Sequence, residues 1–309
     1  MTYTMSRATF LKLAAATGTA ALLGRGGEAM ARPEAIMTRP IPNSGESLPV
    51  VGVGTWQTFD VGDDPAARAQ RAEVLKRLFE AGGSVIDSSP MYGRSERVVG
   101  DLLTDMKAHD KAFLATKVWT WGEGQGRRQM EQSFALLQNE QIDLIQIHNL
   151  VDWQTHLRTL RALKEAGRIR YIGITHYTDS ALPDLAEVIK TEPIDFVQMA
   201  YSIRVREPER MLLPLAAERN VAVIVNRPYE GGSLFRGMRG EKLPGWAADY
   251  GIESWGQFFL KYILSHPAVT CVIPGTSKPR HLLDNVGAGR GPLPDEKTRA
   301  KMAQVLESD

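Results

Sequence analysis

Four residues that can do acid–base chemistry follow one another along the chain: Asp87, Tyr92, Lys117 and His148. Asp87, Lys117 and His148 each close a short apolar run that has the composition of a buried β-strand. Tyr92 follows the first of these runs by a few residues. If the runs are consecutive parallel strands, their carboxyl ends meet at one edge, where α/β proteins gather ligands and catalytic groups. The order of the four residues therefore predicts an active site.

A tyrosine protonates a substrate oxygen near neutral pH only if its anion is stabilised, because the free pKa of a phenol is about 10. An ammonium about 4 Å away, at an effective dielectric of about 20, contributes about 4 kcal/mol, or roughly three pKa units. We therefore expect Lys117 to lower the pKa of Tyr92. Asp87 offers the countercharge that a buried lysine needs. His148 can hydrogen-bond a carbonyl oxygen and fix its orientation.

Eight apolar, β-branched runs, each followed by a segment of helical composition, recur about every thirty residues, the length of a strand-plus-helix unit. Eight such units favour a single α/β domain, a closed (β/α)8 (TIM) barrel, over an open doubly wound sheet. No Gly-x-Gly-x-x-Gly follows the first run, which argues against a Rossmann domain. The expected strands cover residues 51–55, 85–87, 113–117, 144–148, 171–174, 194–198, 221–225 and 269–273.

The remaining segments complete one barrel domain over residues 38–309. An N-terminal β-hairpin is expected over 38–50, with its turn at 43–45. The Gly-rich segment 229–250 is expected to be a long loop, either a lid over the site or a surface loop. Expected helices cover residues 65–81, 96–106, 127–139, 153–166, 181–190, 209–219, 255–264, 280–286 and 294–306.

Composition restricts the classes of partner. The chain has 309 residues, of which 43% are hydrophobic, so it can bury a sizeable core. Its formal net charge of +1 gives no electrostatic case for a nucleic-acid partner. The single cysteine, Cys271, cannot form an internal disulfide and is expected to be a small core residue.

The first residues have the features of an export signal. Arg7 and Lys12 precede the weakly apolar stretch 13–23, and Ala29-Met30-Ala31 fits a small-x-small cleavage site. Residues 6–12 resemble a twin-arginine signal, with Ala8 in the place of the second arginine. The apolar stretch is too short to span a bilayer, which needs about 20 residues. We expect residues 1–31 to direct export to the periplasm. An unprocessed tail on a cytoplasmic protein is the alternative.

The tetrad of Asp87, Tyr92, Lys117 and His148 resembles, in order and spacing, the catalytic tetrad of the aldo-keto reductases. The resemblance extends over residues 38–309 and includes the local sequences at 53–56, 86–93, 116–119, 143–148 and 272–278. It implies a (β/α)8 barrel, a nicotinamide cofactor bound without a Rossmann fold, and hydride transfer to an aldehyde or ketone. By the same resemblance Tyr92 is the proton donor, Lys117 and Asp87 tune it, and His148 positions the carbonyl. No metal is implied.

The resemblance also implies where the cofactor binds. The hydroxyl-rich turn Gly275-Thr276-Ser277-Lys278 before a helix is placed at the adenosine phosphate, with Asp284 and Asn285 near the adenine. Lys278 and Arg280 suit the 2′-phosphate of NADP, although His281 stands where many relatives carry arginine or glutamine; NAD is the alternative. Gln198 is placed at the nicotinamide amide, and Arg227 at the pyrophosphate, after an Asn226 that replaces a stacking aromatic. Further implied contacts are Thr55, Asp87, Thr175 and His176 for the cofactor, and Trp56, Trp119 and Asn149 for the substrate.

Three functions stay open at this point. The first is a carbonyl reductase, or the reverse alcohol dehydrogenase, acting on a small-molecule carbonyl compound. The second is a non-catalytic NADP-binding accessory or sensor module on the same barrel. The third is a metal-dependent hydrolase using Asp87, His148 and His176, which the absence of a His-x-His sequence after the first strand disfavours.

Overall fold

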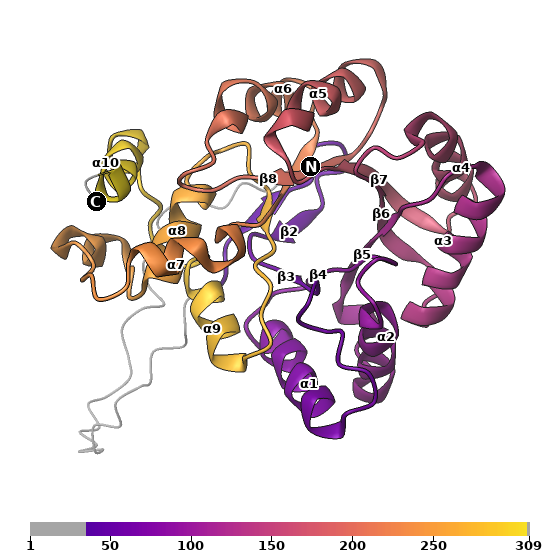
Figure 1. Ribbon diagram of the computed structural model, residues 1–309, viewed down its shortest axis with the longest axis horizontal. Helices are drawn as coiled ribbons and strands as arrows, with labels where there is room; N and C mark the ends of the chain where they lie inside the picture. The colour runs from indigo at the N-terminus through magenta and orange to yellow at the C-terminus, as the bar shows by residue number, and fades with distance from the viewer. Residues whose placement is uncertain (1–34, 308–309) are drawn as a thin grey trace, which may run out of the picture. The chain divides into compact units, whose positions relative to one another are not determined.

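The fold is a parallel barrel surrounded by helices, seen in the computed structural model, which describes residues 35–307 (Figure 1). Eight strands form one sheet in sequential order, and each neighbouring pair is parallel. The strands are β3 (Val53–Gly54), β4 (Val85–Asp87), β5 (Phe113–Val118), β6 (Ile142–His148), β7 (Ile169–Thr175), β8 (Phe196–Ala200), β9 (Ala222–Asn226) and β10 (Cys271–Val272).

The first and last strands meet at a seam that closes the barrel. Gly52 N–H donates to the Val272 carbonyl at 2.8 Å, and Val272 N–H donates to the Val50 carbonyl at 2.9 Å. Isolated parallel bridges join Val51 to Val272 and Gly54 to Gly275. A Cβ atom at Gly54 would lie 2.8 Å from the Ile273 carbonyl oxygen, so the seam requires glycine there. The predicted (β/α)8 barrel is confirmed.

Helices follow the strands and lie around the outside of the sheet (Figure 1). The first begins where predicted because Asp64 caps it, accepting hydrogen bonds from the backbone N–H groups of Ala66 and Ala67. The helices are α1 (Pro65–Glu80), α2 (Ser95–Met106), α3 (Glu123–Leu137), α4 (Trp153–Glu165), α5 (Leu182–Thr191), α6 (Leu212–Glu218), α7 (Ser233–Gly237), α8 (Trp255–Leu264), α9 (Pro279–Gly287) and α10 (Glu296–Glu307).

Two expected segments differ from the structure. The single helix predicted over 209–219 is split into a 3₁₀ turn, Glu207–Arg210, and helix α6. Pro214 accounts for the break, because its ring would clash with the carbonyl group four residues earlier in a continuous helix. The loop predicted over 229–250 instead contains a 3₁₀ turn, Glu230–Gly232, helix α7 and a second 3₁₀ turn, Gly245–Tyr250. Its buried anchors Leu234, Met238 and Ala247 hold it against the core.

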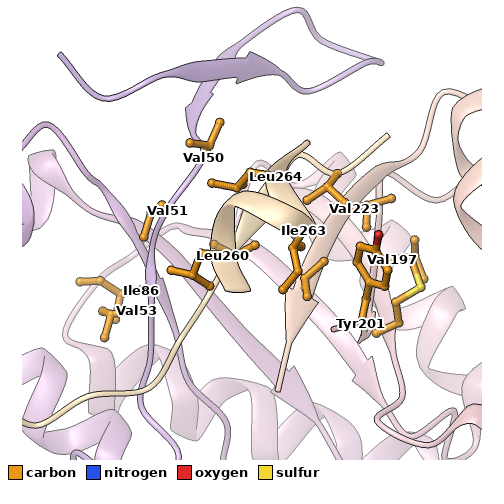
Figure 2. Close-up of a cluster of buried hydrophobic side chains, with 14 of the residues drawn as sticks. Val50, Val51, Val53, Ile86, Val197, Tyr201, Val223, Leu260, Ile263 and Leu264 are labelled. Atoms are coloured by element: carbon orange, nitrogen blue, oxygen red, sulfur yellow. The ribbon is translucent and has the colours of Figure 1, made fainter. Parts of the chain in front are cut away.

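The main hydrophobic core lies between the barrel and its helices. Figure 2 shows Leu260, Ile263 and Leu264 of α8 projecting among the valines of the strands. Gly256–Leu264 of α8 are all buried, which is why this helix is apolar around most of its circumference.

A second cluster fills the inside of the barrel and is covered by the hairpin. Strands β1 (Thr38–Pro40) and β2 (Ser47–Pro49) pair antiparallel, as predicted. Ile41 and Leu48 of the hairpin pack with inward-facing residues near the amino ends of the strands, among them Phe113, Phe196 and Cys271. Cys271 is fully buried with a free thiol, so its predicted place in the core is confirmed. The hairpin thus closes the end of the barrel opposite the predicted site.

Truncating the hairpin's apolar contact is expected to destabilise the whole domain. Leu48 is 1% exposed, so Leu48→Ala should leave a cavity and lower the free energy of unfolding by about 3 kcal/mol. Leu283→Ala is a matched control, because Leu283 is 44% exposed. Urea denaturation measures both variants. Equal losses for the two would contradict the assignment of Leu48 to the core.

Candidate active site

The centre of the site is a buried ion pair between neighbouring strands. Lys117 on β5 and Asp87 at the end of β4 lie with Nζ and Oδ2 2.6 Å apart, and Lys117 is 1% exposed. The ammonium also donates to the Ser88 carbonyl at 2.7 Å. Burial alone lowers the pKa of Lys117, but the charge of Asp87 and the nearby Tyr92 raise it above its ordinary value. The lysine is therefore held as a cation.

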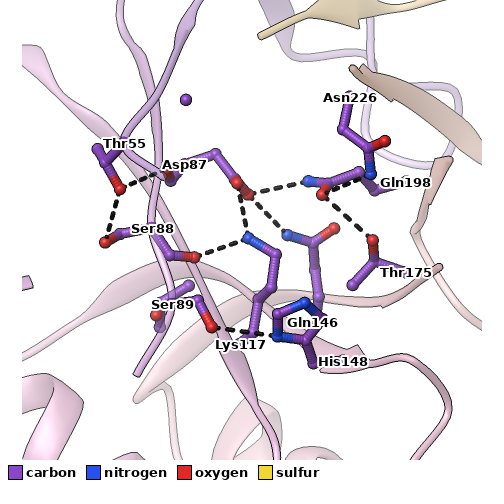
Figure 3. Close-up of polar contacts among 12 residues, drawn as sticks. Thr55, Asp87, Ser88, Ser89, Lys117, Gln146, His148, Thr175, Gln198 and Asn226 are labelled. Atoms are coloured by element: carbon purple, nitrogen blue, oxygen red, sulfur yellow. Dashed lines mark hydrogen bonds and ion pairs between the residues drawn. The ribbon is translucent and has the colours of Figure 1, made fainter. Parts of the chain in front are cut away.

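Two glutamines complete the surroundings of the carboxylate (Figure 3). Oδ1 of Asp87 accepts hydrogen bonds from Nε2 of Gln146 at 3.0 Å and from Nε2 of Gln198 at 2.9 Å. Sequence reasoning missed Gln146. The available signal was a polar residue between two isoleucines, two positions before His148 and so on the same face of β6.

Tyr92 lies beside both the lysine and the histidine. Lys117 Nζ is 5.0 Å from the centre of its ring, and the rings of Tyr92 and His148 meet edge to face with centroids 6.0 Å apart. The structure therefore brings the four predicted residues together. Burial raises the pKa of Tyr92 more than Lys117 lowers it, so the expected net decrease was wrong for the free protein. The phenol is protonated at neutral pH.

His148 is a neutral imidazole next to the phenol. Burial, followed by the charges of Lys117 and His176, lowers its pKa to about 3. Its Nδ1 lies 3.1 Å from Oγ of Ser89, and the side chain is buried. A neutral imidazole keeps one N–H to donate to a ligand oxygen.

The low pKa of His148 predicts a pH-dependent contribution to stability. Between about pH 6.5 and pH 3 the unfolded chain binds a proton that the native histidine does not, so stability is lost as the pH falls through this range. One such group contributes at most about 1.4 kcal/mol per pH unit. The free energy of unfolding of His148→Asn, measured in urea from pH 6.5 to pH 4, should therefore fall less steeply than that of the wild type. Parallel slopes would contradict the neutral, buried histidine.

Several predicted cofactor residues lie on the ends of adjacent strands around Asp87. Gln198 Oε1 accepts from Thr175 Oγ1 on β7 and from Asn226 Nδ2 on β9, both at 3.2 Å. Thr55 Oγ1 donates to the Asp87 carbonyl at 3.1 Å. These contacts make a continuous polar network across the carboxyl ends of the strands (Figure 3).

The residues just beyond these strand ends are held by their own turns. His176 Nδ1 accepts from the backbone N–H groups of Tyr177 and Thr178 at 3.1 and 3.2 Å. The Arg227 guanidinium lies 5.8 Å from the centre of the Tyr177 ring. Arg227 thus stands at the mouth, beside a half-exposed aromatic ring.

The predicted phosphate turn lies at the start of α9. Oγ1 of Thr276 accepts from Lys278 N–H at 3.1 Å, no side chain caps the helix, and Lys278, Arg280 and His281 are exposed. Burial, then the charges of Arg280 and Lys278, lowers the pKa of His281. Ser277 is half-buried next to Lys278 in the chain, whereas Gly275 pairs with the strand end at the seam. The cationic, uncapped helix start fits a phosphate.

Asp284 and Asn285 are turned toward the protein. Asp284 accepts from Ser254 Oγ at 2.8 Å and from Gln257 Nε2 at 3.0 Å. Asn285 Oδ1 accepts from the Tyr229 hydroxyl at 2.6 Å. These carboxylate and amide oxygens therefore tie α9 to α8 and to the segment after β9.

Exposed aromatic side chains stand at the mouth of the barrel. Trp56 is 49% exposed and Trp119 is 40% exposed, so both predicted substrate residues present indole surface there. Trp121, which sequence reasoning missed, is 72% exposed on the same loop as Trp119. Asn149 follows β6 with φ 53°, and its side-chain oxygen is buried without a hydrogen-bond partner in the described part of the chain.

The loop that carries the two tryptophans is tied to α3 and α4. Gln129 accepts from Trp119 N–H at 2.6 Å and donates to the Trp119 carbonyl at 3.2 Å. His156 Nε2 lies 2.7 Å from the Thr120 carbonyl, and Asp152 accepts from Gly122 N–H at 2.7 Å. The loop is therefore fixed by side chains at three successive points.

Within residues 35–307 no three potential ligands lie close enough together to hold a metal ion. The hydrolase hypothesis used Asp87, His148 and His176 as metal ligands. Asp87 instead pairs with Lys117, and the Nδ1 atoms of the two histidines have hydrogen-bond partners within the protein. In the same part of the chain no helix has the length and apolar character needed to cross a bilayer.

Comparison with known proteins finds relatives by sequence and by fold. The chain is 28% identical to methylglyoxal reductase YeaE of Escherichia coli, over 84% of this chain and 90% of that protein. It is 26% identical to the NADH-specific methylglyoxal reductase of E. coli, over 87% and 98%. Its fold matches an aldo/keto reductase from Klebsiella pneumoniae in complex with NADP and acetate, with a TM-score of 0.73, 23% identity, and 85% and 93% coverage. It also matches aldo-keto reductase AKR11C1 from Bacillus halodurans in its holo form, with a TM-score of 0.70, 23% identity, and 88% and 96% coverage. The aldo/keto reductase family profile matches residues 50–303, and the chain belongs to that family.

Proposed function

We propose that the protein is an NADPH-dependent carbonyl reductase, also able to run as an alcohol dehydrogenase, in which Tyr92 is the general acid. One observation carries the proposal. The buried Lys117 ammonium lies 2.6 Å from the Asp87 carboxylate and 5.0 Å from the centre of the Tyr92 ring, at the carboxyl end of the barrel. A cation so placed stabilises the phenolate that remains when the phenol gives up its proton.

Each member of the tetrad then has a separate task. Tyr92 donates its hydroxyl proton to the carbonyl oxygen as that oxygen becomes an alkoxide. Lys117 stabilises the phenolate, and Asp87, held by Gln146 and Gln198, keeps the lysine in place. Neutral His148 donates one N–H to the same oxygen and orients it. A nicotinamide cofactor, when bound, would supply the hydride.

The residues present fit a dinucleotide phosphate. The exposed cations Lys278 and Arg280 at the uncapped start of α9, with the exposed His281 next to them, suit the 2′-phosphate of NADP, and Arg227 suits the pyrophosphate. The nicotinamide end would be held by the amide groups of Gln198 and Asn226, together with Thr55, Thr175 and His176. NADP in the related K. pneumoniae structure supports this cofactor, while the NADH-specific E. coli relative keeps NAD as the alternative.

For the substrate we propose small aldehydes and ketones that reach the mouth between Trp56, Trp119 and Asn149. The name of the E. coli relative, methylglyoxal reductase, makes methylglyoxal the first compound to test.

Loosening the tryptophan loop is expected to weaken substrate binding selectively. Gln129→Ala removes both hydrogen bonds to the Trp119 backbone, so KM for the carbonyl substrate should rise about three- to tenfold. The Kd for NADPH should stay unchanged, because Gln129 lies on α3, on a different side of the barrel from α9 (Figure 1). Steady-state kinetics and cofactor titration measure the two quantities. An equal loss for both ligands would count against a substrate role for the loop.

The proposed function is tested by NADPH oxidation with purified protein. Methylglyoxal and a panel of reactive aldehydes and ketones should be reduced, with NADH tested in parallel. Fluorescence titration of both cofactors gives their affinities independently of turnover. A protein that binds NADPH tightly and turns over no carbonyl compound would instead be an accessory or sensor module.

We also propose that the protein is exported with residues 1–31 removed, and that it acts in the periplasm. Those residues lie outside the described part of the chain, so the proposal rests on Arg7, Lys12, the stretch 13–23 and the Ala29–Ala31 site. A route that carries folded proteins would let the enzyme leave with its cofactor bound. Cell fractionation with N-terminal sequencing tests this. An intact Met1 on cytosolic protein would contradict export.

A further inference from the structure

Ser89 lies beside the histidine of the site without being one of its four acid–base residues. Its Oγ is 3.1 Å from Nδ1 of His148, and the side chain is fully buried (Figure 3). Met91 N–H donates to the same oxygen at 3.3 Å, in a local turn that fixes where the hydroxyl stands. The contact joins the segment after β4 to the end of β6. The hydroxyl thus reaches one ring nitrogen of His148 and leaves the other free.

The hydrogen bonds around Ser89 favour one direction for the contact, because the serine hydrogen has a partner only when Ser89 is the donor to His148. The Ser89 oxygen already accepts from Met91, so its own hydrogen is available to donate. Nδ1 of His148 is the acceptor within reach of that hydrogen among the described residues. A neutral imidazole has one N–H and one lone pair. When Nδ1 accepts, the imidazole proton must therefore be on Nε2.

The two sides of the ring have different surroundings. Nε2 of His148 makes no hydrogen bond with the residues that the structure describes, and the edge of the ring meets the ring of Tyr92. Burial, the Lys117 ammonium and the nearby His176 all oppose a second proton on the imidazole. The question at this ring is therefore which nitrogen carries the single proton.

We propose that Ser89 is a positioning residue that holds His148 as the tautomer protonated at Nε2. The inference rests on the proposed function, because an Nε2–H donor serves to hold a carbonyl oxygen beside the Tyr92 hydroxyl. In the other tautomer, Nε2 presents a lone pair, which repels an oxygen that is gaining negative charge. Ser89 acts through His148 and needs no contact with the substrate.

The tautomer can be observed without turnover. In protein labelled with 15N-histidine, long-range 1H–15N spectra distinguish a protonated from an unprotonated ring nitrogen, and His148→Asn identifies the signals of His148. The wild type should show Nε2 protonated and Nδ1 as an acceptor. Ser89→Ala should show a mixture of the two tautomers. A wild-type ring protonated at Nδ1, or a Ser89→Ala spectrum equal to that of the wild type, would overturn the proposal.

Kinetics provide a second, independent readout. Ser89→Ala should lower kcat/KM for carbonyl reduction about five- to tenfold, the factor that one neutral hydrogen bond contributes, while the Kd for NADPH stays unchanged. In a His148→Asn background the same substitution should change kcat/KM less than twofold, because its target is gone. Ser89→Thr, which keeps the hydroxyl, should recover most of the activity of the wild type. Equal losses in both backgrounds would show that Ser89 acts elsewhere.

The two experiments separate this inference from the proposed function. A wild type that reduces no carbonyl compound would refute the reductase function, whereas the NMR spectra would still report the tautomer. An active enzyme whose His148 tautomer ignores Ser89 would refute the inference alone.

Discussion

Replacing Tyr92 by phenylalanine is expected to lower kcat/KM for carbonyl reduction by at least about 10³-fold, because it removes the hydroxyl whose anion the Lys117 ammonium stabilises. The ring itself remains, with its edge-to-face contact to His148. Stability and the Kd for NADPH should therefore change little. Steady-state kinetics at high enzyme concentration measure kcat/KM, and fluorescence titration measures the Kd for NADPH.

A second Tyr→Phe substitution, away from the site, controls for the general effect of removing a phenolic hydroxyl. Tyr250→Phe also removes a phenolic oxygen, one that lies 2.9 Å from Thr298 Oγ1 on α10. This variant should keep the full activity of the wild type. If Tyr92→Phe retains more than a tenth of that activity, another group delivers the proton and the proposed mechanism is wrong.

Replacing Lys117 by methionine should cost both activity and stability. The phenolate of Tyr92 would lose its neighbouring cation, so kcat should fall about 10²- to 10⁴-fold. The Asp87 carboxylate would stay buried with only the two glutamine donors, and breaking a buried pair in this way destabilises a protein by about 3–5 kcal/mol. Kinetics on the folded fraction and urea denaturation measure the two losses.

The surface of the same molecule offers the control. Lys164 on α4 and Asp195 are also 2.6 Å apart, but the lysine side chain is 40% exposed. Lys164→Met should cost about 1 kcal/mol or less and leave kcat unchanged. If the two methionine variants lose the same free energy of unfolding, the burial of the Lys117–Asp87 pair is not the reason that it stabilises the fold.

The four acid–base residues could be predicted because each follows an apolar run whose carboxyl end faces the same way. Asp87, Lys117 and His148 close or nearly close β4, β5 and β6, and the parallel register of those strands brings them together. The order of strands and the hairpin were equally visible, since apolar runs and turn residues are local signals. Each of these predictions needed only the types of residues that are adjacent in the sequence.

What could not be predicted depends on contacts between distant parts of the chain. Gln146 bonds to a carboxylate 59 positions earlier in the sequence, and nothing in its own segment indicates that partner. The net rise in the pKa of Tyr92 follows from how completely the finished fold buries the phenol, which spacing alone does not give. The helices within 229–250 likewise depend on three apolar side chains that pack against the core. The glycines of that segment favour a loop when the sequence is considered alone.

The seam between the first and last strands means that the barrel can close only late in synthesis of the chain. On the edge that faces away from β4, residues 50–54 pair with Val272 and Gly275, so this edge stays unpaired while most of the polypeptide leaves the ribosome. Until then the backbone groups at this edge of the sheet are unpaired and can pair with strands of other chains. Slowing synthesis before residue 270 should therefore lengthen the period in which the protein aggregates.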